Sequence, residues 1–497
     1  MRAVILGLLL ASAARAQAPA TFTDPDRAEK VAATEATVSA MFRDYWERSH
    51  MPGFAYGVVL DGEVIYSGAF GLAQLDGQVP ADTRTLFRIA SMSKSFTALA
   101  ILQLRDEGRL ALDDPASQYV PEMAELTYLT SDAPVITIRH QLTHSAGFPE
   151  DNPWGDRQLA DSDEELRAHV ARGVSFSNVP GIEYEYSNLG FALLGQIVQV
   201  VSGMDFQDYM AEHVFGPLGM TSTVWEYERA PAERLALGYD WVDGDWVNIP
   251  LEHHGAYGAM GGLITSIEDF ARYVALHLAA WPPRSDPDDG PLRRSSLREM
   301  HQPWRFASLS GSECPAAAAY AYGLRWSVDC DDRVTIGHSG GLPGFGSNWT
   351  MMPDYGLAVM SFDNRTYGGT SGVNLAVLDT IVALAGLQPR QLPVSDILEE
   401  RKNQLVALLP SPKGAEKSGI FAENFFMDNR PSDVVAYARR FLEEAGEILR
   451  VGEMVALNQL RGTFVLECER RNIEVFFTLT PESVPLIQEL RMRSVAR

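Results

Sequence analysis

The chain has 497 residues and a formal net charge of −24 at neutral pH, and 46% of its residues are hydrophobic. This length predicts two or three domains, and the hydrophobic content is sufficient for a large core. A strongly acidic chain argues against binding to nucleic-acid phosphates or to anionic membrane surfaces, so no nucleic-acid partner is expected.

The N-terminus has the three parts of a secretory signal peptide. Arg2 supplies the positive end, residues 3–10 form an apolar core, and a small-residue cleavage site ends at Ala16. We therefore expect residues 1–16 to be removed on export and the mature chain to be periplasmic or secreted. Neither this apolar stretch nor any later one is long enough to span a bilayer, so no transmembrane anchor is expected.

A helix and a β-hairpin precede the first chemical motif. Residues 38–48 have helical character, and the strand-like runs 53–60 and 63–70 flank an Asp61-Gly62 turn. We therefore expect an antiparallel sheet to begin before the first motif.

A nucleophile and a candidate base stand at the start of an apolar helix. Ser91 and Lys94 are followed by residues 95–104, which are apolar on almost every helical face and therefore predict a buried helix, with Gly108 as its stop. Residues three apart on a helix are neighbours, so the lysine should reach the serine. Free backbone N–H groups at the first turn favour a nearby anion. The spacing also arises by chance, because serine caps helices and lysine favours them.

Two histidines suggest a metal site as an alternative chemistry. His140 and His144 have the spacing of zinc ligands on a helix, but no acidic residue completes an H-E-x-x-H pattern and no third ligand is obvious. We expect both histidines to be structural, where a short helix turns at Gly147, and we expect no metal.

A second chemical stretch follows a turn at Pro180-Gly181. Tyr186 and Asn188 are two residues apart in an extended segment, so they can face one cavity before a helix over residues 189–201. A tyrosine hydroxyl beside a lysine ammonium can have its pKa lowered and pass protons. An asparagine amide can both donate to and accept from one ligand. The structural alternative is a tyrosine corner with an asparagine helix cap.

The third chemical stretch is a strand that ends in glycines. Residues 337–341 match the G-x-S-x-G pattern of α/β-hydrolases, in which a helix must directly follow the serine. Here a Pro-Gly pair follows instead, and no histidine comes after His338 to complete a triad. We therefore predict a strand edge at which Gly340 and Gly341 let a ligand backbone lie close.

With these stretches in place, the chain from about residue 32 to 387 resembles the β-lactamase-related serine hydrolases. That family includes class C β-lactamases, D-alanyl-D-alanine carboxypeptidases, D-aminopeptidases and esterases. The resemblance is carried, in the family's order, by Ser91-Met-Ser-Lys94, Tyr186-Ser-Asn188 and His338-Ser-Gly340. It implies an α+β fold for residues 30–387, a β-lactamase/transpeptidase-like antiparallel sheet flanked by helices, with an all-helical subdomain over about residues 110–250.

The resemblance also implies a role for each matching residue. Ser91 would be the nucleophile that is acylated, with Lys94 and Tyr186 sharing its proton, and Tyr186 would activate the deacylating water. Asn188 would hold a substrate amide. The substrate-binding residues would be Asn188, His338, Ser339, Gly340 and Gly341. The backbone N–H groups of Ser91 and Gly341 would form the oxyanion hole, and no cofactor is implied.

One residue departs from the penicillin-recognising pattern. Those members usually carry lysine where this chain has His338, and a mostly neutral histidine holds a carboxylate less firmly. This departure favours an esterase or a peptidase. We therefore expect an exported serine hydrolase that forms an acyl-enzyme on Ser91 with a small-molecule or peptide substrate, either an ester or a D-amino-acid amide. The alternatives are a penicillin-binding-type receptor that acylates without turnover and a β-lactamase.

The chain changes character near residue 388. Residues 388–420 contain four prolines around one helical segment and indicate a linker. Residues 421–497 contain a helix followed by three strand-like runs, which predicts a small α+β domain with no chemical constellation of its own.

Three cysteines remain to be placed. Export makes a disulfide between Cys314 and Cys330 possible, and it would close a short loop. Cys468 lies in a strand-like run and is expected to be a buried thiol. Their spacing fits no metal site.

Overall fold

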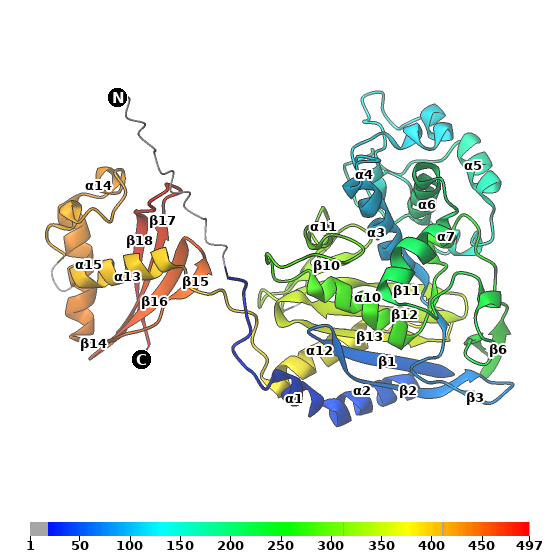
Figure 1. The fold of residues 1–497 in the computed structure, drawn as a ribbon, viewed down its shortest axis with the longest axis horizontal. Coiled ribbons are helices and arrows are strands. Elements are labelled where there is room, and N and C mark those ends of the chain that lie inside the picture. Colours follow the sequence, from blue (N-terminus) through cyan, green and yellow to red (C-terminus); the bar gives the residue numbers. More distant parts are fainter. Residues whose placement is uncertain (1–17, 312, 410–411, 497) are drawn as a thin grey trace, which may run out of the picture. The chain divides into compact units, whose positions relative to one another are not determined.

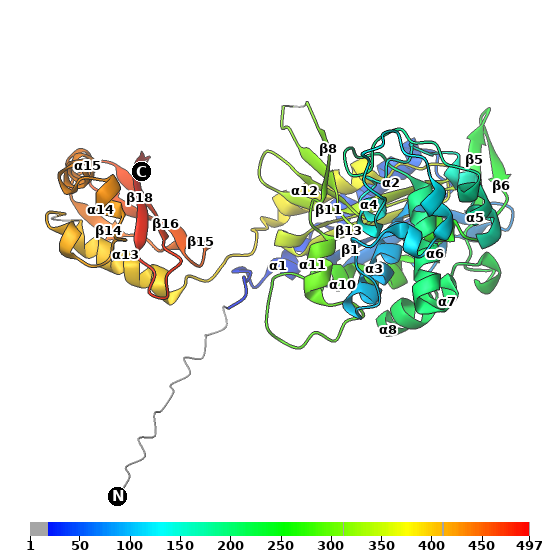
Figure 2. The same ribbon diagram turned by 90° about the horizontal axis from the view of Figure 1, so that it is seen from above.

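The computed structural model describes residues 18–496 except 312 and 410–411. The chain forms two compact units, and Figures 1 and 2 show the fold of each. One unit is Asp24–Pro389, and the other is Arg390–Arg497 together with residues up to Thr23. The predicted signal peptide, residues 1–16, lies outside the described residues.

The larger unit is built on a nine-stranded antiparallel sheet. Its strand order, β3-β2-β1-β13-β12-β11-β10-β9-β8, pairs the N-terminal hairpin with the last strand of the unit. Asp61 and Gly62 both have positive φ, as the predicted hairpin turn requires. The strands are β1 (Gly53–Leu60), β2 (Glu63–Gln74), β3 (Val79–Pro80), β8 (Arg305–Leu309), β9 (Ala317–Tyr320), β10 (Arg325–Val328), β11 (Val334–Leu342), β12 (Phe345–Met352) and β13 (Leu357–Asp363).

Helices cover both faces of this sheet (Figures 1 and 2). One face packs on α1 (Arg27–Ala32), α2 (Glu35–Arg48) and α12 (Ser371–Ala385). The other face packs on α3 (Ser93–Asp106), α10 (Ile267–Ala279) and α11 (Arg294–Met300). All eight residues of β1 are buried, because a central strand between two helical layers has no solvent-facing side. The predicted α+β fold is confirmed.

The subdomain between α3 and α10 is mainly helical, with one correction. Its helices are α4 (Ile138–Leu142), α5 (Asp163–Ala171), α6 (Asn188–Ser202), α7 (Phe206–Met210), α8 (Gly216–Leu218) and α9 (Gly258–Gly261). A hairpin of β5 (Gly238–Val242) and β6 (Asp245–Ile249) ends the region that was expected to be all-helical. The local sequence explains it, because tryptophans and valines flank an Asp243-Gly244 turn. Two short strands, β4 (Phe87–Arg88) and β7 (Ile264–Thr265), pair beside this subdomain.

The C-terminal unit has a five-stranded sheet and its own core. Its strands are β14 (Ile448–Val451), β15 (Val455–Asn458), β16 (Arg461–Cys468), β17 (Asn472–Leu479) and β18 (Ile487–Val495). Its helices are α13 (Asp396–Leu408), α14 (Phe425–Asp428) and α15 (Pro431–Ala445). Helix α13 lies within residues 388–420, the predicted linker, and its Leu398 and Leu405 are buried in this core. The prolines of that segment flank the helix, and none lies within it.

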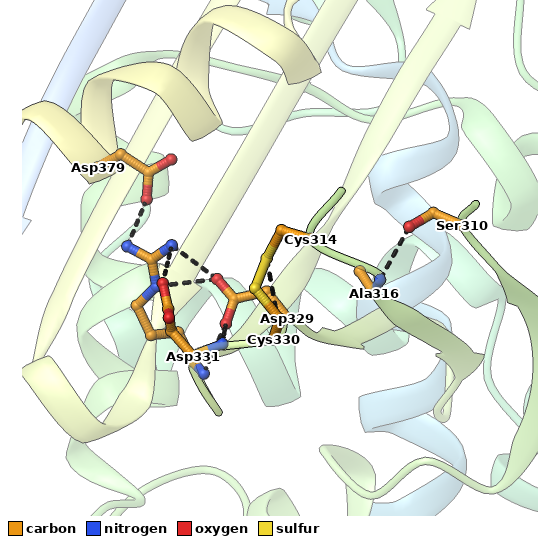
Figure 3. Close-up of a disulfide and its surroundings, with 8 residues drawn as sticks. Ser310, Cys314, Ala316, Asp329, Cys330, Asp331 and Asp379 are labelled. Atoms are coloured by element: carbon orange, nitrogen blue, oxygen red, sulfur yellow. Dashed lines mark hydrogen bonds and ion pairs between the residues drawn. A yellow bond between two sulfur atoms is a disulfide. The ribbon is translucent and has the colours of Figure 1, made fainter. Parts of the chain in front are cut away.

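The structure joins Cys314 and Cys330 by a disulfide (Figure 3). The bond ties the β8–β9 loop to the β10–β11 turn. Beside it, Arg333 pairs with Asp329 on the same turn and with Asp379 on α12. Cys468 is a free, buried thiol.

No single helix among the described residues has both the length and the apolar composition needed to cross a membrane. One bent pair, Asn188–Ser202 with Phe206–Leu218, passes by length and composition alone.

Candidate active site

Ser91 lies in a 3-10 turn immediately before α3, with Lys94 one turn further on. The Lys94 ammonium donates to Ser91 Oγ at 3.0 Å, to Asn188 Oδ1 at 2.7 Å and to the Met260 carbonyl at 2.8 Å. These three acceptors use all three of its donors and hold the side chain, which has no exposed surface, in one position. The structure therefore places a fixed amine against a serine hydroxyl.

The turn before Ser91 has an unusual backbone. Ala90 has a φ of 49°, a left-handed conformation that is unfavourable for a residue with a Cβ. Strand β11 packs tightly on this turn, since a Cβ on Gly340 would lie 2.2 Å from the Ile89 carbonyl oxygen and 2.9 Å from Ala90 Cβ. Only glycine at position 340 allows the strand to approach the nucleophile this closely.

Burial changes the acidity of Lys94. Loss of solvent lowers its pKa to about 7, and the carboxylates of Asp156 and Asp151 partly oppose this effect. A substantial fraction of the lysine is therefore neutral at neutral pH. A neutral amine at hydrogen-bond distance can accept the Ser91 proton.

Tyr186 faces the same lysine, but its pKa shifts in the opposite direction. Its ring centroid lies 4.9 Å from Lys94 Nζ, and its side chain is buried. Burial raises the pKa of Tyr186 far above its ordinary value, although a hydrogen bond with Ser91 opposes the shift. The lysine does not lower the pKa of Tyr186 here, because the ammonium faces the aromatic ring while the hydroxyl is desolvated. Tyr186 is therefore a neutral hydroxyl that can relay a proton.

Asn188 begins α6 and contacts the lysine directly. Its Oδ1 accepts from Lys94, and its Nδ2 donates to Asn152 Oδ1 at 2.6 Å. The Asp151 carboxylate accepts from the backbone N–H groups of Asn188 and Leu189 at 2.6 and 2.8 Å, which satisfies the helix N-terminus. In this structure Asn188 is fully buried and positions the lysine.

His338 is buried and neutral. Its Nδ1 lies 2.5 Å from the Ser339 carbonyl, which can only accept, so Nδ1 carries the proton and Nε2 accepts from the Tyr320 hydroxyl at 2.9 Å. Burial holds the pKa of His338 well below its ordinary value, and the positive charges of Arg325 and Lys94 add to this effect. The histidine therefore supplies no positive charge to a substrate.

Arg325 supplies the charge that His338 lacks, and the sequence patterns did not reveal it. Strand β10 pairs with β11 only as far as Arg325 opposite Gly337, whereas the following residues of β11 pair with β12 alone. The guanidinium lies 5.7 Å from the Tyr186 ring centroid and, with Ser339, lines a cavity of about 340 Å³. Arg325 thus stands at the end of an open strand edge. Its only sequence signal is a cation in a short strand, which no motif marks.

The two candidate metal ligands have structural partners. His144 Nδ1 accepts from the Ser187 backbone N–H at 3.1 Å, and His140 forms a capping box with Thr137 at the start of α4. Within the part of the chain that the structure describes, no group of three metal-ligating side chains is assembled.

The arrangement defines a class of protein. A serine at a helix start, a buried lysine bonded to it, a tyrosine beside both and an open strand edge lie together, as the family resemblance implies. The family model described as Beta-lactamase matches residues 38–384, and the chain belongs to that family. The predicted membership of a serine hydrolase family is therefore confirmed.

Similar proteins come from bacteria, fungi and archaea. Protein flp of Staphylococcus aureus is 30% identical over 326 residues, which cover 65% of this chain and 61% of that protein. The unguisins hydrolase ungD' of Aspergillus campestris is 29% identical over 334 residues, covering 65% and 60%. The chain thus spans about three fifths of the length of these curated relatives. The octameric penicillin-binding protein homologue of Pyrococcus abyssi shares the fold, with a TM-score of 0.58, 20% identity and coverage of 92% of this chain and 99% of that chain.

Proposed function

We propose that the chain is an exported serine hydrolase that forms an acyl-enzyme on Ser91 and hydrolyses an ester or a D-amino-acid amide or peptide. The observation that carries this proposal is the 3.0 Å contact between Lys94 Nζ and Ser91 Oγ, made by an amine whose pKa is near 7. The name of the Aspergillus relative, a hydrolase, supports the reaction class.

The geometry supports a specific order of proton movements. Neutral Lys94 accepts the Ser91 proton as Oγ attacks the substrate carbonyl. The backbone N–H groups of Ser91 and Gly341 stabilise the resulting oxyanion, and each donor is worth roughly 3–4 kcal/mol. Tyr186, hydrogen-bonded to Ser91, then relays a proton to the leaving group. The products are the acyl-enzyme and a protonated leaving group.

Arg325 favours substrates that carry an anion on the leaving group. Because His338 is neutral, the Arg325 guanidinium at the end of the β11 edge can hold a carboxylate of a substrate that lies along that edge. A peptide with a free C-terminal carboxylate would place that group there. This contact supports a peptide substrate beside the simple ester.

Export is part of the proposal. The N-terminal sequence pattern supports it, and the Cys314–Cys330 disulfide is a bond that persists in oxidising compartments outside the cytosol.

The alternative, a receptor or β-lactamase of the penicillin-binding type, is favoured by one observation. The raised pKa of Tyr186 leaves no ionised phenolate to activate the deacylating water. A long-lived acyl-enzyme would follow if no other base replaced it.

Hydrolysis of p-nitrophenyl butyrate by the purified protein, beside a Ser91→Ala variant, tests the proposal. Steady turnover that disappears in the variant is the expected result. Turnover that survives the substitution would contradict the mechanism. A single burst without steady turnover would favour the receptor.

A further inference from the structure

Tyr367 bridges the open edge of β11 and the helical subdomain. It lies in the turn after β13, where its backbone N–H donates to the Leu342 carbonyl at 3.2 Å and its ring lies against Gly341, since a Cβ there would be 2.9 Å from Tyr367 Cδ1. Its hydroxyl donates to Asp156 Oδ2 at 3.1 Å. The pair therefore closes the end of the edge opposite to Arg325.

Asp156 is a buried carboxylate with an unused oxygen. Only 2% of its surface is exposed, and Oδ1 has no hydrogen-bond partner among the residues that the structure describes. Burial raises the pKa of Asp156 to about 6, and Lys94 is the largest opposing influence, so the group is mainly ionised at neutral pH. A buried carboxylate oxygen without a donor is unfavourable unless a ligand supplies one.

The position of Asp156 points to the acyl part of a substrate. The neighbouring Gly155 lies against Asn188, since a Cβ on it would be 2.7 Å from Asn188 Cβ, and Tyr367 connects the carboxylate to Gly341. Asp156 thus lies between the predicted oxyanion donor and the helix that positions Lys94. Arg325 and Asp156 place opposite charges at the two ends of one substrate edge.

We propose that Asp156 and Tyr367 form the recognition site for the acyl part of the substrate, and that Asp156 Oδ1 binds an ammonium group next to the scissile carbonyl. This inference rests on the proposed function and narrows its substrate class to amides and esters of amino acids with a free amino group. Asp156 is nearly covered whereas Tyr367 is 45% exposed, so the ligand would reach Asp156 after the Tyr367 side chain rotates toward solvent. Together with Arg325, the arrangement fits a short peptide with both termini free.

The test compares two ligands that differ in one group. D-alanine p-nitroanilide carries an ammonium where D-lactic acid p-nitroanilide carries a hydroxyl, and calorimetry on the Ser91→Ala variant measures their binding without any turnover. We expect the ammonium ligand to bind at least about tenfold more tightly, as a charge-assisted hydrogen bond predicts. Adding Asp156→Asn should bring the ratio of the two dissociation constants close to one. Glu150→Gln, which removes an exposed charge from the same loop, is the matched control and should leave the ratio as it was.

Three outcomes would overturn the proposal. The first is equal binding of the two ligands to the Ser91→Ala variant. The second is that Asp156→Asn weakens the binding of both ligands by the same factor. The third is that Glu150→Gln abolishes the preference for the ammonium ligand as fully as Asp156→Asn does. Tyr367→Phe removes the hydrogen bond to Asp156 but keeps the carboxylate, so it should retain the preference for the ammonium ligand. This variant shows whether the preference depends on the carboxylate itself or on the local structure around it. Because this assay needs no turnover, a failure of the proposed hydrolase would appear separately, as absent p-nitrophenyl butyrate hydrolysis.

Discussion

The two units bury lysine in different ways. Lys94 in the larger unit donates to uncharged oxygen and sulfur atoms, and its nearest carboxylates act at a distance. Lys402 on α13 is also buried, but its Nζ is paired with the Glu399 carboxylate at 3.0 Å. The first arrangement leaves a poorly compensated charge that readily loses its proton, whereas the second keeps an ordinary ion pair. Burial of a cation indicates chemistry only where its partners do not neutralise it.

Removing each lysine tests this comparison most strongly. Lys94→Met should lower kcat/KM for p-nitrophenyl butyrate about a thousandfold, or about 4 kcal/mol, because no base remains for Ser91. Lys402→Met, the matched control in the other unit, should change it less than about twofold. The measurement is steady-state kinetics, with circular dichroism to show that both variants fold. Equal losses in the two variants would mean that Lys94 is only structural.

A truncating substitution in the core of the C-terminal unit should lower its stability. Leu466 is fully buried and pairs across the sheet with the buried Ile473, so Leu466→Ala should lower the free energy of unfolding of that unit by about 2–5 kcal/mol. Urea unfolding gives the loss of stability, and amide hydrogen exchange shows whether that loss is confined to the strands of this unit. If the amides of β11 also lost their protection from exchange, the two units would unfold as one.

Substitution of Arg325 tests whether this residue recognises a carboxylate on the leaving group. Arg325→Gln should lower kcat/KM about tenfold or more for 3-acetoxybenzoate, whose leaving group carries a carboxylate, and leave phenyl acetate nearly unaffected. Arg333→Gln, which removes a cation from the turn after β10, is the matched control. A parallel loss on both esters would rule out recognition of the leaving group.

The pH profile tests Lys94 without a substitution. Because the neutral amine is the reactive form and its pKa is near 7, kcat/KM should fall about tenfold for each pH unit below that value and level off above it. Glu150→Gln offers a comparison, since loss of a nearby negative charge should shift the midpoint slightly downward. A profile that is flat from about pH 5 to 8 would contradict a lysine base with this pKa.

Local patterns were sufficient for the parts of the site that adjoin one another in sequence. Ser91 and Lys94 share a helical turn, and the observed contact follows from the helical repeat alone. The hairpin around Asp61-Gly62 and the apolar strand pattern likewise required no tertiary information. The Asp243-Gly244 turn indicates the β5–β6 hairpin equally well, but the family resemblance implies helices in that region.

By itself the sequence determined the family, the α+β fold and the residue types of the candidate site, because motif spacing and hydrophobic periodicity are properties of neighbouring residues. Only the tertiary structure decided the ionisation of Lys94 and Tyr186, which depends on how fully each is desolvated. It also brought Arg325 to one end of the β11 edge and Asp156 to the other. These charges come from strands and loops far apart in the chain, and electrostatic energies depend on distance and burial, which no local pattern encodes.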